Sequence, residues 1–175
     1  MAIAGGAPDP RLGHFQDGGA ARGVVGCRPV PPPLGDGSCL PGCGMPLLTV
    51  VTPFYNEAST LRPSIERVLA IADDALTLEI ILVNDCSRDD SPSVAAALAT
   101  EYPCVRLLHH EVNQGKGAAL RTGIAHATGD FVAIHDADLE YDPQDLVRLL
   151  GPLREGQADV VFGSRFASGG PHRVL

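Results

Sequence analysis

From Leu47 onward, short apolar runs alternate with segments of helical period, and this order limits the fold more than any other feature of the chain. The runs are rich in β-branched and aliphatic residues and too short for buried helices, so they predict strands. The predicted strands are Leu47–Thr52, Leu78–Val83, Val105–His109, Phe131–His135 and Asp159–Phe162.

The segments between these strands carry apolar side chains at helical spacing, most clearly over residues 61–72 and 146–153. Ser91-Pro92 and Asp142-Pro143 each place a capping residue before a proline at the first helical position. Gly129 stands where the helix before it should end. Strands and helices in this order predict an α/β fold with a mostly parallel, doubly wound, Rossmann-like sheet.

Glycine and proline gather at the start of the chain. Met1–Pro46 holds 11 of the 20 glycines and 8 of the 15 prolines, without hydrophobic periodicity. We interpret residues 1–46 as a disordered leader and residues 47–175 as one globular domain. The net charge of −8 lies on the globular part, because the leader's three arginines balance its three aspartates. An acidic surface repels phosphate backbones, so nucleic acid is not an expected partner.

The sequence lacks the apolar segments that membrane insertion needs. It holds no run of about 18 apolar residues and no apolar core of a secretory signal. We expect a cytoplasmic location. The protein could also associate peripherally with the cytoplasmic face of the membrane. The five cysteines, an odd number with three in the leader, are interpreted as free thiols.

Polar and acidic loops follow three of the predicted strands: Pro53–Glu57, Asn84–Asp89 and Asp136–Glu140. Ligands of doubly wound sheets bind outside the carboxyl ends of the strands. We therefore expect the functional site at this edge of the sheet.

The acidic loop after the fourth predicted strand is the strongest local signal. If the extended backbone continues, Asp136, Asp138 and Glu140 project to one side, where their mutual repulsion favours a bound cation. Oxygen ligands that leave room for water and phosphate suit Mg²⁺ or Mn²⁺. The alternative is a solvated acidic turn that leads into the next helix.

Other candidates lie on neighbouring loops. Asp85 could accept hydrogen bonds from ribose hydroxyls or base N–H groups, or be a turn aspartate that bonds its own backbone. Asn113–Gly117 lacks the spacing of a Walker phosphate loop, but Lys116 and the helix N-terminus would add positive potential near a phosphate. Arg165 could bind a diphosphate through two hydrogen bonds of its guanidinium, or form an ion pair with a nearby carboxylate.

Five segments in this order resemble family-two glycosyltransferases, most of all the polyprenyl- and dolichyl-phosphate mannose and glucose synthases, from about Leu47 to the end of the chain. The segments are Val50–Glu57, Val83–Asp89, Asn113–Gly117, Asp136–Asp138 and Phe162–Phe166. The resemblance implies a GT-A fold that binds a nucleoside-diphosphate sugar, a UDP- or GDP-hexose.

The resemblance also implies roles for individual residues. Base and ribose would be surrounded by Pro53, Tyr55, Glu57 and Asp85. Asp136 would lie at the ribose and metal side and Asp138 on the metal, with Glu140, usually Gln in the mannose synthases, as a further carboxylate ligand. Asp138 and Arg165 would act in catalysis, because the metal and the guanidinium share the charge of the departing diphosphate.

The implied reaction is a metal-dependent inverting transfer. A polyprenyl-phosphate acceptor already carries an anionic oxygen, whereas a sugar hydroxyl would need a carboxylate base. Because family members continue beyond the equivalent of Leu175 with acceptor-binding elements, we expect a donor-binding part with an incomplete acceptor half. The alternative is a truncated fragment that binds a nucleotide sugar but does not catalyse transfer.

Overall fold

The computed structural model describes residues 2–5 and 45–163. Within these residues six strands form one sheet, and four helices cover it. The strands are β1 (Ala2–Gly5), β2 (Leu47–Phe54), β3 (Thr77–Asn84), β4 (Val105–His109), β5 (Phe131–Ile134) and β6 (Val160–Phe162). The helices are α1 (Leu61–Leu69), α2 (Ser91–Glu101), α3 (Lys116–Ala125) and α4 (Gln144–Arg154).

The sheet has the order β4-β3-β2-β5-β1-β6 and is mostly parallel, as predicted. β2 pairs in parallel with β3 and β5, and β3 pairs in parallel with β4. β1 is antiparallel to both of its neighbours, β5 and β6. Every strand predicted from the sequence is present, with ends that differ by at most two residues.

The predicted disorder of the leader is wrong for Ala2–Gly5, which form β1. The physical reason is burial: β1 lies between β5 and β6, and the side chain of Ile3 is 1% exposed in the core. In the rest of the predicted leader, Met1 and residues 6–44 lie outside the described residues.

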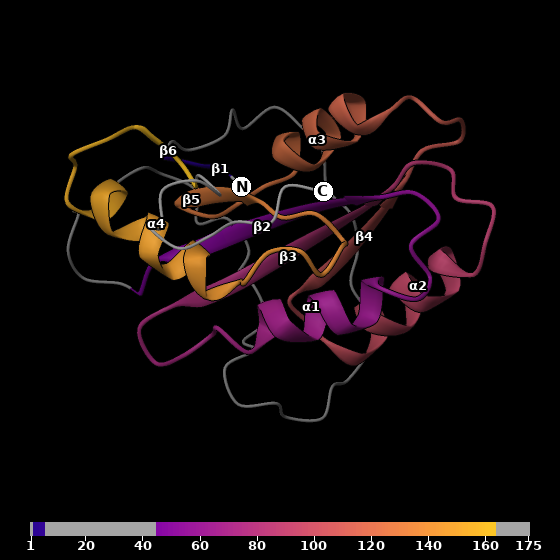
Figure 1. Cartoon of the computed structure of the whole chain (residues 1–175), viewed down its shortest axis with the longest axis horizontal. Helices are drawn as coiled ribbons and strands as arrows, with labels where there is room; N and C mark the ends of the chain where they lie inside the picture. Colours follow the sequence, from indigo (N-terminus) through magenta and orange to yellow (C-terminus); the bar gives the residue numbers. More distant parts are fainter. Residues whose placement is uncertain (1, 6–44, 164–175) are drawn as a thin grey trace, which may run out of the picture.

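The helices form a layer on each face of the sheet (Figure 1). α1, α2 and α4 pack on one face, where Leu61, Leu98 and Leu146 belong to the larger hydrophobic cluster. α3 covers the other face through a smaller cluster that includes Ile81 and Ala119. Of the helices in residues 45–163, none is both long and apolar enough to cross a membrane.

Two expected helix starts are each shifted by one residue. α2 begins at Ser91 with Asp90 as its N-cap, and α4 begins at Gln144 with Pro143 as its N-cap, so neither proline is the first helical residue.

Two other local expectations, at Gly129 and at the cysteines, also need correction. α3 ends at Ala125, so Gly129 does not end it. Gly129 instead lies against β2, where a Cβ atom would be 2.6 Å from the carbonyl oxygen of Leu47. The free-thiol interpretation is confirmed for Cys86 and is wrong for Cys104, which is disulfide-bonded.

Gly123 sets how closely α3 approaches the sheet, and Gly123→Ala is expected to destabilise the protein by about 1–3 kcal/mol. The new Cβ would overlap Val51 Cγ1 and lie 3.3 Å from Val83 Cγ2. The measurement is urea unfolding of Gly123→Ala, of Val51→Ala and of the double variant, whose loss should be smaller than the sum of the two single losses because the overlap is relieved. Gly117→Ala, on the same helix with no atom within 4 Å, should unfold at the same or higher urea concentration. Equal midpoints for the two alanine variants would contradict close packing at Gly123.

Candidate functional site

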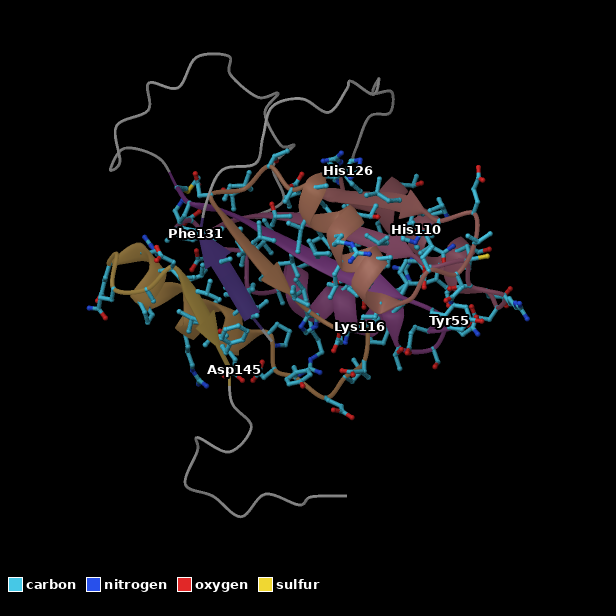
Figure 2. All side chains as sticks on the ribbon, turned by 90° about the horizontal axis from the view of Figure 1, so that it is seen from above. Tyr55, His110, Lys116, His126, Phe131 and Asp145 are labelled. Carbon is cyan, nitrogen blue, oxygen red and sulfur yellow. The ribbon has the colours of Figure 1, made fainter. Side chains whose placement is uncertain are left out.

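An open cavity of about 230 Å³ lies at the carboxyl edge of the sheet. It is lined by Pro53, Phe54, Tyr55, Glu57, Asp85, Lys116, Ala119, Asp136, Ala137 and Asp138. Figure 2 shows two of them, Tyr55 and Lys116, on the side of the molecule away from Phe131, the first residue of β5. The structure thus gathers residues from three separate loops, as the topology predicts.

Two predicted site residues are not among those that line the cavity. Glu140 is exposed in the loop beyond Asp138. Arg165 lies outside the described residues, so its predicted contact with a diphosphate stays a prediction.

The loop after β2 is held in a strained turn. Asn56 has a φ of 58°, a left-handed conformation uncommon outside glycine, and its side-chain Oδ1 accepts a hydrogen bond of 2.8 Å from the Arg88 backbone N–H. The backbone N–H of Glu57 donates to Ser91 Oγ at 2.7 Å, and Thr60 Oγ1 donates to the Glu57 carboxylate at 2.6 Å. These bonds fix the entrance to α1 at the rim of the cavity.

Asp85 fastens the loop before α3 to the end of β3. Its Oδ1 accepts from the Gln114 backbone N–H at 2.9 Å, and its Oδ2 accepts from the Gly115 N–H at 2.8 Å. Its backbone oxygen accepts from Asn113 Nδ2 at 3.1 Å. Asp85 is therefore not a turn aspartate that bonds its immediate neighbours. Each carboxylate oxygen can still accept a further hydrogen bond, and the contact with base or ribose stays a prediction.

His110 completes this arrangement and was missed as a site residue, because it follows no metal-ligand spacing. Its side chain is 8% exposed, with Nδ1 2.8 Å from Asp85 Oδ1 and Nε2 2.9 Å from Thr122 Oγ1 of α3. Burial acts to raise the pKa of Asp85, but hydrogen bonds from Gln114, His110 and Gly115 outweigh it and hold that pKa below its usual value.

The three acidic residues after β5 do not form one cluster. Among the described residues, no group of three or more His, Cys, Asp or Glu side chains is placed to share a metal ion. β5 ends at Ile134, and the chain then bends, so that the Glu140 N–H turns back to Asp138 Oδ1 at 3.1 Å. The extended alternation expected from the sequence therefore stops before it can align Glu140 with the two aspartates.

Asp136 already has a cation beside it. Lys116 Nζ lies 2.7 Å from Asp136 Oδ1 and 2.8 Å from Oδ2. The carboxylate of Asp136 attracts positive charge to this position, as expected for a residue that binds a metal cation. Two carboxylates at the cavity, Asp136 and Asp138, match the one or two that Mg²⁺ commonly takes from a protein, with water and phosphate as its other ligands.

A buried hydroxyl supports the acidic loop from below. Ser64 of α1 is 1% exposed, and its Oγ lies 3.4 Å from the Asp136 carbonyl oxygen, 3.3 Å from that of Asp138 and 3.3 Å from His135 Nε2. Burial lowers the pKa of His135 even though the charges of Asp136 and Asp138 act to raise it. A neutral His135 and the Ser64 hydroxyl therefore pack under the loop without adding a competing charge.

A model of the family described as Glycosyl transferase family 2 matches residues 49–173. The chain belongs to this family. The match contains all the predicted site residues and every described strand except β1 and the start of β2.

Curated members of glycosyl transferase family 2 are similar over part of their length. The dolichol-phosphate mannosyltransferase of Pyrococcus furiosus is 32% identical over 126 residues, 70% of this chain and 34% of the relative. A dolichyl-phosphate beta-glucosyltransferase of Trichomonas vaginalis is 39% identical over 97 residues, 52% of this chain and 30% of the relative. The chain spans about a third of the length of these relatives.

A solved structure of similar fold is glucosyl-3-phosphoglycerate synthase from Mycobacterium tuberculosis, in complex with Mn²⁺, UDP and glucosyl-3-phosphoglycerate. It is 29% identical, with a TM-score of 0.51, and the match covers 62% of this chain and 39% of that one. This likeness and the strand order confirm the predicted GT-A fold, a Rossmann-like α/β sheet.

Proposed function

We propose that the cavity binds a nucleoside-diphosphate sugar, a UDP- or GDP-hexose, together with Mg²⁺ or Mn²⁺. The observation that carries the proposal is the meeting of Asp85, Asp136, Asp138 and Lys116 around one cavity at the carboxyl edge of the sheet. The bound Mn²⁺ and UDP in the solved structure of similar fold support the same ligand chemistry.

Seven of the ten lining residues have a part in this proposal. Pro53, Tyr55 and Glu57 would surround the base and ribose, on the loop fixed at the start of α1. Asp136 and Asp138 would hold the metal, which supplies charge neutralisation for the departing diphosphate when it is bound. Asp85 would orient the loop that carries Lys116. Its carboxylate would also accept a hydrogen bond from the nucleoside.

The proposed reaction is an inverting transfer of the hexose to a polyprenyl phosphate. Two similar relatives are named for dolichyl phosphate, which supports a lipid phosphate. The anionic oxygen of a lipid phosphate attacks without a general base. This fits the cavity, because each carboxylate among its described lining residues already has another proposed role. Attachment at the cytoplasmic face of a membrane would follow from such an acceptor.

Calorimetric titration with UDP-glucose and GDP-mannose, with and without Mn²⁺, tests donor binding. Asp138→Ala is expected to reduce Mn²⁺-dependent affinity at least about tenfold, because half of the protein's metal ligands would be lost. The control is Asp145→Ala, which removes an exposed carboxylate paired with Arg148 on α4. Binding that needs no metal and is unchanged by Asp138→Ala would contradict the proposal.

A second measurement separates transfer from binding alone. Radiolabelled sugar moved to a polyprenyl phosphate by this chain would support the transferase. Donor binding without any transfer would favour the alternative, a donor-binding part that is catalytically incompetent.

A further inference from the structure

We infer that Lys116 is an exchangeable counter-ion, which holds Asp136 in the metal-free protein and passes to the donor's phosphates when a divalent cation binds Asp136. The inference rests on the proposed function and adds a coupling between metal and donor. Its basis is the contact of one ammonium group with both oxygens of a proposed metal ligand.

The pair between Lys116 and Asp136 is built to exchange. The side chains of Lys116 and Asp136 are 60% and 29% exposed, and solvated pairs of this kind contribute little to stability. The backbone beneath Lys116 is fixed, because Gly115, with a φ of 85°, donates its N–H to Asp85 and accepts from Ala119. The ammonium group can therefore change position by rotation about the bonds of the lysine side chain, while the backbone keeps its place.

The charge of the cavity explains why the exchange matters. Among the described residues that line it, Lys116 is the single cation beside four carboxylates, those of Glu57, Asp85, Asp136 and Asp138. A diphosphate cannot approach so many negative groups without positive charge. A metal that displaces the ammonium from Asp136 frees that ammonium for the phosphates, so metal and donor should each strengthen the binding of the other.

Removal of Lys116 should change the affinities for metal and for nucleotide in opposite directions. Lys116→Met should raise the affinity for Mn²⁺ alone, by roughly threefold, because the competing cation is gone. The same change should weaken UDP or GDP binding in the presence of Mn²⁺, so that the mutual enhancement between metal and nucleotide shrinks. Lys116→Arg keeps the charge and should behave more like the wild type.

Free Mn²⁺ can be followed by electron paramagnetic resonance with and without UDP or GDP. Arg121→Met is the matched control, because Arg121 is an exposed cation on the same helix and does not line the cavity. If Arg121→Met raised Mn²⁺ affinity as much as Lys116→Met, a general charge effect would replace the specific exchange. Circular dichroism would verify that each variant is folded.

Lys116 is the only lysine of the chain, which gives a second readout independent of activity. In protein labelled with ¹³C-lysine, its ε-methylene resonance should shift on addition of Mg²⁺ alone and shift again when UDP or GDP follows. A resonance unmoved by saturating Mg²⁺, or a Lys116→Met variant with unchanged or weaker Mn²⁺ affinity, would overturn the inference alone. A wild-type chain that binds neither Mn²⁺ nor nucleotide would overturn the proposed function as well.

Discussion

Replacing Glu79 by alanine is expected to lower the free energy of unfolding by about 3–5 kcal/mol. Glu79 lies in β3 with no exposed side-chain surface, and its Oε2 accepts from Thr49 Oγ1 at 2.6 Å and from the Thr128 N–H at 2.8 Å. Its Oε1 accepts from Arg106 Nη1 at 3.0 Å. The carboxylate thus joins β2, β4 and the turn before β5. Its loss would leave the buried Thr49 hydroxyl without its acceptor, next to the space that the side chain had filled.

Urea unfolding of three variants would measure this effect. Glu79→Gln keeps the shape and one acceptor oxygen, so it should cost less than Glu79→Ala. Glu66→Ala removes a carboxylate from an exposed pair with Arg62 and should cost less than about 1 kcal/mol. If Glu79→Ala and Glu66→Ala unfolded at similar urea concentrations, the network around Glu79 would not be a main source of stability.

The strands near the middle of the sheet could be predicted because they are buried on both faces. β2 and β3 carry nearly continuous apolar runs, which leave little doubt about their type. β1 could not be predicted in the same way. Its four residues are too few to show a period, and only the place between β5 and β6 gives Ile3 a buried environment.

The candidate site shows the same division between local and long-range information. The loops could be placed from topology alone, since parallel strands end at one edge. The pairing of Asp85 with Gln114 and Gly115, 29 and 30 residues later, depends on how α3 packs, which no local pattern reports. Glu79 left a usable signal, because a carboxylate inside an apolar strand must find buried partners.

Replacing Asp85 by alanine should cost about 2–4 kcal/mol of stability and abolish measurable donor binding, because one carboxylate anchors the loop that presents Lys116. Two backbone N–H groups and His110 would lose their acceptor together. Urea unfolding and calorimetry with UDP-glucose or GDP-mannose would measure the two effects. Asp74→Ala, which removes an exposed carboxylate between α1 and β3, is the control and should change neither quantity.

The pH dependence of the Asp85→Asn variant tests the cause of this stabilisation. Because the folded pKa of Asp85 lies below its ordinary value, its ionisation stabilises the native state above the unfolded pKa, and this contribution is lost as the pH falls through the folded pKa. The difference in unfolding free energy between wild type and Asp85→Asn should therefore shrink as the pH falls below about 4. Asp89 and Glu101, whose pKa values are also lowered, keep their contributions in both proteins and cancel from the comparison. A difference that stayed constant down to pH 3 would mean that Asp85 holds the loop by shape and not by charge.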